Sequence, residues 1–487
     1  MILALLLVPL VSGVAAFWWR HDAGRRALLI VAALVHSGVT AATWRWQPTP
    51  LVDGWLDLDS AGRLFLSILS ALFLVAAIYG VGYLAREKQT RHIDFQENQY
   101  FSNEPEAVFT ACLLFFLASM TLVTLSQHFG LLWVAIEATT LASAPLIYFH
   151  RQHRSLEATW KYLLICSVGI AIALVGNFLL AVAAAGLGDA PGKLILANLV
   201  HAGSGLHRPW LEAAFIFFLV GYGTKMGLAP LHTWLPDAHS ESPSVVSALL
   251  SGALLNCAFL GILRAHQVCL SAGAGDFSAG LLLVFGLFSM AIAAVFILGQ
   301  VDFKRMLAYS SVEHMGILAV GVGLGGAGVF GSALHAVNHS LTKAGLFLVA
   351  GNILRAYQSK QVNDVRGLNR VLPWSGVLWL AGFLAITGTP PFGPFLSEFT
   401  ILKAAVDQSR WLVTILYLGL LGLIFIAMAN IVLRMGQGGG TREPAAEPVW
   451  SIVPPATLCV VVLVLGVYVP PEIRTLLNDV SRALGGR

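Results

Sequence analysis

The chain has 487 residues, of which 57% are hydrophobic and only 11% are charged. Soluble domains carry about 25% charged residues, so this composition excludes an ordinary soluble domain and predicts a polytopic membrane protein. The net charge of +4 is mild, comes from loop arginines and gives no indication of nucleic-acid binding. The five cysteines are scattered through apolar segments without a CxxC pair, which argues against an iron–sulfur site in this chain.

Apolar segments follow one another along the whole chain and predict an all-α fold of about fourteen transmembrane helices. A hydrocarbon core of about 30 Å needs spans of about 20 residues. The first segment lacks a basic n-region and a cleavage site, so we expect a retained helix rather than a signal peptide. The segments begin near Ile2, Ala27, Leu64, Val108, Leu131, Tyr162, Trp210, Ser244, Ala279, Met306, Phe330, Trp374, Trp411 and Trp450.

Lysine and arginine residues are concentrated in alternate loops. The richer set holds Arg20, Arg25, Arg26, Arg86, Lys88, Arg91, Arg151, Arg154, Lys161, Lys304, Arg305, Arg355, Lys360, Arg366, Arg370, Arg434 and Arg442. The opposite loops hold Arg45, Arg63, Lys193, Arg208, Arg264 and Arg410, with three more arginines in the tail. Because cytoplasmic loops carry the excess of positive charge, we expect a multi-pass protein of the cell inner membrane with both termini outside.

Two segments are interrupted by proline and glycine, which cannot continue a regular helix. The first interruption follows Lys225 in the seventh helix, and the second lies at residues 387–399 in the twelfth. Broken helices at membrane depth are tolerated where the freed backbone lines a cavity or is covered by protein. Paired interruptions indicate inverted repeats around a site at the midplane, and an offset of five helices requires the repeats to run in opposite directions.

These positions divide the chain into four parts. N-terminal helices 1–3 occupy residues 1–106, and the first inverted repeat, helices 4–8, occupies residues 107–268. The second repeat, helices 9–13, occupies residues 278–436. A linker rich in Gly, Pro and Ala, the fourteenth helix and a short tail make up residues 437–487.

Glu137 in the fifth helix and Lys225 in the seventh are the first candidate site residues. An ionisable group inside a bilayer is costly unless it has a partner or a water-filled cavity, so it indicates a functional site by default. A lone buried carboxylate would be neutral, whereas one beside a lysine can stay ionised. We therefore predict a titrating Glu137–Lys225 pair; the alternative is a fixed structural ion pair.

His335, His339 and Lys343 in the eleventh helix are spaced i, i+4 and i+8, which places them on one helical face over about 12 Å. Because histidine titrates near physiological pH, this ladder is suited to proton relay. A packing role is one alternative. Metal or haem binding is another, and we disfavour it because no acid or cysteine accompanies the histidines at ligand spacing.

Glu398 follows the second interruption and Lys403 lies five residues later, so we expect one of them to be the exit-side proton carrier. The alternative for this pair is a cap for the half-helix end. In the tenth helix His314 and Glu313 are adjacent and must point to different faces. Of these two, His314 is the stronger candidate to line the path.

Polar residues near the first interruption have two readings that the sequence leaves open. His232, Asp237 and His239 line a cytoplasmic entrance or cap the broken helix. Asp302 and Lys304 stand at the start of a helix, where we expect a surface cap and a surface anchor.

Together these motifs resemble the antiporter-like membrane subunits of complex I, membrane-bound hydrogenases and multisubunit cation/proton antiporters. The resemblance covers the chain from about Val108 to Arg434. It rests on Glu137, the Lys225–Pro230 break, LPDAHSESPSVVSALLSG, FKRMLAYSSVEHMGI, the His/His/Lys helix and a broken twelfth helix ending in SEF. The run from Gly223 to Phe259 is most similar to the component F branch of hydrogenase-4-type enzymes.

The resemblance implies two proton half-channels joined across the midplane. Glu137 and Lys225 would be the controlling pair, the His335–His339–Lys343 ladder the connecting relay, and Glu398 the carrier of the second half. One residue departs from the pattern: complex I subunits usually carry a central lysine in the eighth helix, where this chain has Asn256. An amide cannot hold a proton charge at neutral pH, which favours the hydrogenase-like branch or a relay through water and histidine.

The leading hypothesis is a proton-translocating subunit of a redox-driven complex of hydrogenase-4 or formate-hydrogenlyase type. Its partners would be other membrane subunits and a peripheral redox arm. Fe–S and NiFe centres belong to those partners, since no cofactor or metal is expected in this chain. The alternatives are a cation/proton antiporter subunit, a subunit like chain M or N of NADH-quinone oxidoreductase, and a non-pumping anchor.

Overall fold

The computed structural model describes residues 1–87, 92–93, 100–185, 194–437 and 442–486. Three cations used for the orientation, Lys88, Arg91 and Lys193, lie outside the described residues, and so do residues 438–441 of the predicted linker.

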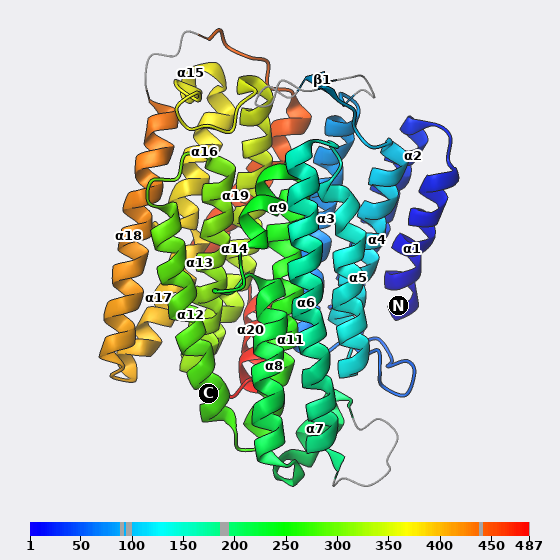
Figure 1. Cartoon of the computed structure of the whole chain (residues 1–487), viewed down its shortest axis with the longest axis vertical. Helices are drawn as coiled ribbons and strands as arrows, with labels where there is room; N and C mark the ends of the chain where they lie inside the picture. The colour runs from blue at the N-terminus through cyan, green and yellow to red at the C-terminus, as the bar shows by residue number, and fades with distance from the viewer. Residues whose placement is uncertain (88–91, 94–99, 186–193, 438–441, 487) are drawn as a thin grey trace.

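The described residues form a bundle of long, nearly parallel helices (Figure 1). Each of the fourteen predicted segments coincides with a helix or with a run of consecutive helices. The first six and the broken seventh are α1 (Ile2–Trp18), α2 (Asp22–Ala42), α3 (Ser60–Leu84), α4 (Glu106–Leu125), α5 (Phe129–Ile147), α6 (His153–Ala183), and α8 (Arg208–Met226) with α9 (Trp234–Glu241). The eighth is a continuous run of α10 (Ser244–Leu249), π-helical η3 (Leu250–Leu254) and α11 (Leu255–Ser271). The others are α12 (Gly275–Ile297), α13 (Phe303–Leu324), α14 (Ala327–Tyr357), α16 (Pro373–Ile386) with α17 (Gly393–Asp407), α18 (Trp411–Gly436) and α19 (Val449–Val467).

Ten of the described helices are long and apolar enough to cross a membrane by length and composition. The segments that fall short are α1, α8, α14 and the α16–α17 pair. Of these, α1 is short, with 17 residues. In the α16–α17 pair the break leaves two helices of 14 and 15 residues, each too short to cross alone. The other two, α8 and α14, are long enough but less apolar, and they carry Lys225 and the histidine ladder.

Both predicted interruptions are present. Helix α8 ends at Met226 and is capped by Gly227 in a left-handed conformation (φ +87°), and α9 begins at Trp234. In the second, α16 ends before Gly388 (φ +64°) and α17 begins at Gly393. After the breaks, α9 packs against α6 and α13, and α17 packs against α14, while Pro230 and Leu231 of the first break and Pro390 and Pro391 of the second are exposed at the surface of the chain. The division into two five-helix repeats stays a prediction.

Several short elements were not predicted. They are α7 (Leu196–Ala202), η2 (Gly203–Gly205), α15 (Leu368–Val371), α20 (Pro471–Ala483), and a hairpin of β1 (His92–Ile93) and β2 (Tyr100–Phe101). Helix α20 buries Leu476, Leu477 and Val480 and packs against α3 and α14. In Figure 1 the N-terminus lies at the lower end of α1, near the middle height of the view, and the C-terminus lies in the lower half of the bundle.

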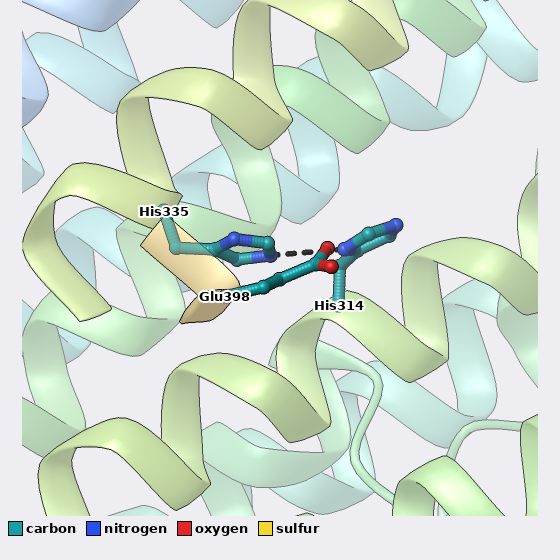
Figure 2. Close-up of side chains that lie close together, drawn as sticks. All are labelled: His314, His335 and Glu398. Atoms are coloured by element: carbon teal, nitrogen blue, oxygen red, sulfur yellow. Dashed lines mark hydrogen bonds between the residues drawn. The ribbon is translucent and has the colours of Figure 1, made fainter. Parts of the chain in front are cut away.

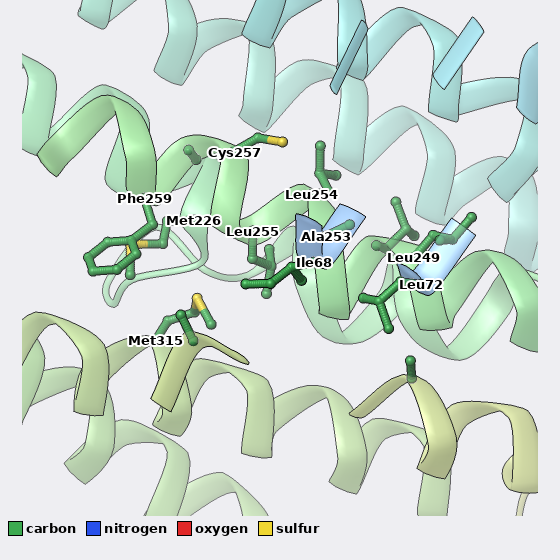
Figure 3. Packing of buried hydrophobic residues seen from close by; sticks show 14 of the residues in the cluster. Ile68, Leu72, Met226, Leu249, Ala253, Leu254, Leu255, Cys257, Phe259 and Met315 are labelled. Carbon is green, nitrogen blue, oxygen red and sulfur yellow. The ribbon is translucent and has the colours of Figure 1, made fainter. Parts of the chain in front are cut away.

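The eighth segment lies at the centre of the bundle. Its most apolar window is entirely buried, whereas the corresponding window of α18 is only 28% buried. Figure 3 shows Leu249, Ala253 and Leu254 of this segment packed near Ile68 and Leu72 of α3. A helix that is apolar on all sides is buried inside a large protein, so the polar Asn256 on this segment has no access to bulk water and must be satisfied by neighbouring groups.

Candidate functional site: two buried polar clusters

Lys225 lies in the last turn of α8 and is completely buried. Its ammonium donates to Thr140 Oγ1 of α5 at 2.9 Å and to Tyr162 OH of α6 at 2.6 Å. It also lies 4.3 Å from the centre of the Tyr162 ring, which is cation–π distance. A charge removed from water is thus held by hydroxyls and an aromatic ring.

Glu137 is joined to Lys225 through one hydroxyl. Thr140 Oγ1 donates to Glu137 Oε2 at 3.3 Å, and Ser167 Oγ donates to Glu137 Oε1 at 2.8 Å. Both charged side chains are described, and they make no direct ion pair. The structure therefore brings the predicted pair together, but with Thr140 between its members. A hydroxyl that accepts from an ammonium while it donates to a carboxylate can pass a proton as well as hold the pair in place.

The histidine ladder is completed from another helix. His314 of α13 and His335 of α14 share a hydrogen bond of 2.9 Å between Nδ1 and Nε2. The ring centre of His314 lies 5.1 Å from that of His335 and 5.0 Å from that of His339, whereas the ring centres of His335 and His339 are 6.3 Å apart. The ring of His314 is therefore closer to His335 and to His339 than those two rings are to each other, although helical spacing alone had predicted His335 and His339 to be direct neighbours. Lys343 makes no hydrogen bond with these rings within the described structure, and its ammonium donates to Leu307 O at 2.6 Å and Ser310 Oγ at 2.8 Å.

Glu398 enters the same cluster from α17, as Figure 2 shows. Its side chain is buried, its Oε1 has no hydrogen-bond partner among the described groups, and its other oxygen faces the backbone of Gly388 at the helix break. His335 Nδ1 also contacts Ser397 Oγ at 2.9 Å. Lys403, by contrast, is 63% exposed and pairs with Asp407 on the outside of α17. Of the two predicted carriers, the structure places only Glu398 with the histidines.

One donor set in this cluster could hold a metal ion. Single ligand atoms of His314, His335 and Glu398 all lie within 4.8 Å of one another. The sequence argument against metal binding was that no acid accompanies the histidines, and that reason is wrong because folding brings Glu398 to them. The two histidines, however, direct ring nitrogens at each other in a hydrogen bond. The arrangement as it stands shares a proton between two rings instead of offering both lone pairs to a cation.

Asn256 is hydrogen-bonded to α14 beside the second cluster. Its Nδ2 donates to Gly252 O at 3.0 Å and to Ser340 Oγ of α14 at 2.7 Å, and Ser340 is the neighbour of His339 in the chain. Within the described structure its Oδ1 has no partner. The preceding turn is the π-helical η3, and such bulges are frequent at functional sites.

The polar residues of the first break have different roles. His239 is buried in α9, where its Nδ1 contacts Leu235 O at 2.9 Å and its ring lies between Trp234 and Phe347. His232 packs against two aromatic rings, 6.2 Å from each. Asp237 forms ion pairs with Lys161 of α6 and Arg305 of α13, so it ties α9 to its two neighbours.

Lys304 corrects the sequence interpretation. Asp302 caps α13 as expected, accepting from the backbone of Lys304 and Arg305. Lys304 itself is only 1% exposed and is no surface anchor, since it donates to Ser240 O at 3.0 Å and Ser242 O at 2.7 Å at the end of α9. A cation at the C-terminal end of a helix interacts favourably with the free carbonyls there.

The last residue of α9, Glu241, pairs with Lys360 at 2.7 Å. Burial acts to raise the pKa of Glu241, but the charge of Lys360 and its hydrogen bond outweigh burial and hold this pKa below its usual value.

The sequence analysis did not identify four hydroxyl residues of the two clusters, Thr140, Tyr162, Ser340 and Ser397. The only signal for Thr140 was its position three residues after Glu137 on the same helical face.

Comparisons with known proteins support the resemblance. The sequence model of the family described as "NADH:quinone oxidoreductase/Mrp antiporter, TM" matches residues 126–424. A hydrogenase-4 component F homolog of Methylacidiphilum infernorum is 37% identical over 85% of this chain and 86% of its own length. A chain of an archaeal membrane-bound sulfane sulfur reductase has a TM-score of 0.85 at 20% identity and covers 100% of this chain and 98% of its own. A chain of respiratory complex I from Thermus thermophilus has a TM-score of 0.76 at 24% identity, covering 96% and 97%.

Proposed function

We propose, from the premise that this chain belongs to the NADH:quinone oxidoreductase/Mrp antiporter transmembrane family, that it is a proton-translocating subunit of a redox-driven complex. The 37% identity to a hydrogenase-4 component F homolog favours a complex of hydrogenase-4 or formate-hydrogenlyase type. The proposed partners are other membrane subunits and a peripheral arm that carries Fe–S and NiFe centres. The proposed location is the cell inner membrane, with both termini outside.

The observation that carries the proposal is the pair of buried polar clusters, with the buried Asn256 in contact with the helix of the second. In the first cluster, Glu137, Thr140 and Lys225 form a continuous hydrogen-bonded series. In the second, His335 joins His314 and Ser397, with Glu398 alongside. Buried ionisable groups are expensive, and a fold that needs only an anchor gains nothing from so many of them.

Proton movement would follow from the chemistry of these groups. Lys225 releases or takes up a proton through hydroxyls that both accept and donate. Each imidazole can take a proton on one nitrogen and release one from the other, and Glu398 accepts at the far side. Water would complete the steps between Lys225, Asn256 and His339. A change in charge near Glu137, caused by redox chemistry in a partner, would alter the free energy of the proton on Lys225.

The deciding experiment measures substrate-driven proton uptake in inverted membrane vesicles that carry the whole complex. Lys225→Ala should abolish pumping while the complex still assembles. Lys403→Ala is the matched control, because this lysine is exposed and lies outside both clusters. Unchanged pumping in Lys225→Ala would contradict the proposal and leave an anchor role. Proton movement that needs an imposed sodium gradient and no redox turnover would favour the antiporter alternative.

A further inference from the structure

A polar cavity of about 480 Å³ lies at the end of the bundle where α3, α9 and α14 end and α10 and α19 begin. This is the upper end in Figure 1. Among the residues that the structure describes, its lining is unbalanced in charge: it includes five cations, Arg86, Arg154, Lys304, Arg355 and Lys360, and two acids, Glu87 and Glu241.

Some of these charges already have partners within the protein. Lys360 pairs with Glu241 at 2.7 Å, and Lys304 donates to two backbone carbonyls. Glu87 accepts from Asn103 at 2.8 Å. The two acids are therefore engaged by other donors. Of the remaining cations in the lining, Arg86 and Arg355 lie beside Trp450.

Trp450 brings these two guanidinium groups together. The central carbon of Arg86 lies 5.2 Å from the centre of the Trp450 ring, and that of Arg355 lies 5.5 Å from it. Arg355 Nη2 donates to Ala446 O at 3.2 Å, while its buried Nη1 has no partner among the described groups. Two like charges held around one ring repel each other, and an anion between them would relieve that repulsion.

The shape and setting of the cavity indicate which anion. Guanidinium groups present forked donors that match the oxygens of a phosphate. Tyr79 packs edge-on against Trp450 with 5.4 Å between ring centres, so the wall beside the cations is aromatic. Aromatic residues gather at membrane interfaces, and basic pockets between transmembrane helices bind anionic headgroups.

We propose that this cavity binds a phosphate group, either that of an anionic lipid headgroup or that of a free phosphate compound. The inference does not depend on proton translocation, since it rests on the cavity, its charges and Trp450. It also gives the cavity a link to the path, because Ser240 and Ser242 in its lining belong to the end of α9, next to the buried His239.

The first arm of the test uses the full chain purified in its complex and measures bound phospholipid by native mass spectrometry. Phosphatidylglycerol and phosphatidylcholine compete for the protein. The wild type should retain phosphatidylglycerol preferentially, and the Arg86→Gln/Arg355→Gln double variant should lose this preference by about tenfold or more. Arg410→Gln is the matched control, since it removes an exposed arginine outside the cavity and should behave as the wild type.

The second arm titrates inorganic phosphate into delipidated protein by calorimetry and tests whether phosphate displaces the lipid. Retained lipid that phosphate does not displace identifies a headgroup site. Phosphate binding without a lipid preference identifies a site for a free phosphate compound. Equal binding by the wild type and the double variant in both arms, or none in either, overturns the proposal. Arg86→Gln alone, which changes an exposed side chain, covers the case in which the double variant fails to fold, and it should show the same loss in part.

Discussion

Asn256 Nδ2 donates a hydrogen bond of 2.7 Å to Ser340 Oγ, and this contact joins the eighth segment to α14 one residue from His339. Ser340 in turn donates to Ala336 O at 2.6 Å, so its hydroxyl accepts and donates at once. The family resemblance places a lysine in this region, and the structure shows what an amide does there instead. It keeps a polar connection between the eighth segment and α14, beside His339, without adding a buried charge.

We expect Asn256→Leu to interrupt that connection. Leucine has a similar volume but offers neither donor nor acceptor, so substrate-driven proton uptake should fall about tenfold, equivalent to about 1.4 kcal/mol in the barrier. Uptake in inverted vesicles, normalised to the amount of assembled complex, is the measurement. The control is Asn177→Leu, another buried asparagine, which lies on α6 away from both clusters. Equal pumping by the Asn256 variant and the wild type would show that protons do not cross at this contact.

Thr140→Val tests the hydroxyl between Glu137 and Lys225. Valine keeps the shape but removes a group that bonds to two charged side chains, and hydrogen bonds to charged groups contribute about 1.5–3 kcal/mol. Pumping should fall by roughly tenfold or more. Thr140→Ser keeps the hydroxyl and should restore most of the rate. If valine and serine gave the same rate, Thr140 would be a packing residue only.

Much of the fold could be predicted from the sequence because the bilayer limits what a chain can do. Apolar runs of about 20 residues become spans, and prolines and glycines in such runs become breaks. The histidine ladder followed from helical periodicity alone. Each of these features depends on the residues of one continuous segment and not on how distant segments pack. This is why the two predicted breaks and the fourteen predicted segments agree with the structure.

Contacts between side chains on helices that are distant in the sequence could not be predicted in this way. Thr140 meets Lys225 only because α5 and α8 pack in a particular register, and His314 enters the ladder from a separate helix. Lys304 was wrongly expected at the surface, since its position at a helix start gives no sign that the carbonyl end of α9 lies above it. Lys403 and Glu398 are five residues apart and so point in different directions from α17.

Lys304→Met should loosen α9. Methionine fills a similar volume, but Ser240 O and Ser242 O lose their donor, and an unsatisfied buried acceptor costs about 1–3 kcal/mol. We expect a lower melting temperature and faster amide exchange over residues 234–244 in exchange mass spectrometry. Lys403→Met, at an exposed site, should change stability by no more than about 0.5 kcal/mol. Identical exchange in the two variants would mean that the bonds from Lys304 to Ser240 O and Ser242 O do not hold α9 in place.

His128 should make stability depend on pH. Its Nδ1 caps α5 by accepting from Gly130 N at 3.1 Å and Leu131 N at 3.4 Å, which requires a neutral ring, and burial lowers the pKa of His128 from 6.5. A histidine with a lowered native pKa stabilises the fold above its unfolded pKa, and this contribution is lost as the pH falls below about 6.5. His128→Asn keeps a capping acceptor that does not titrate. The melting temperature of the wild type should therefore fall relative to His128→Asn between pH 7.5 and 5.5; parallel curves would contradict this.

Gly388→Ala tests whether the second break positions Glu398. The glycine has φ +64°, and a Cβ there would overlap Glu398 Oε2, so the carboxylate would have to leave the histidine cluster. Gly325→Ala is a matched control, because Gly325 has φ +70° but its Cβ would meet no atom within 4 Å. Gly325 has ψ −172°, a combination with positive φ that is essentially restricted to glycine, so Gly325→Ala also carries a backbone cost, of about 1–3 kcal/mol, but places no atom against Glu398. We expect Gly388→Ala to lose proton uptake to the extent that Glu398→Gln does, while Gly325→Ala retains it. A similar loss in both glycine variants would mean that backbone strain alone impairs the protein and that the contact between Gly388 and Glu398 has no role in positioning the carboxylate.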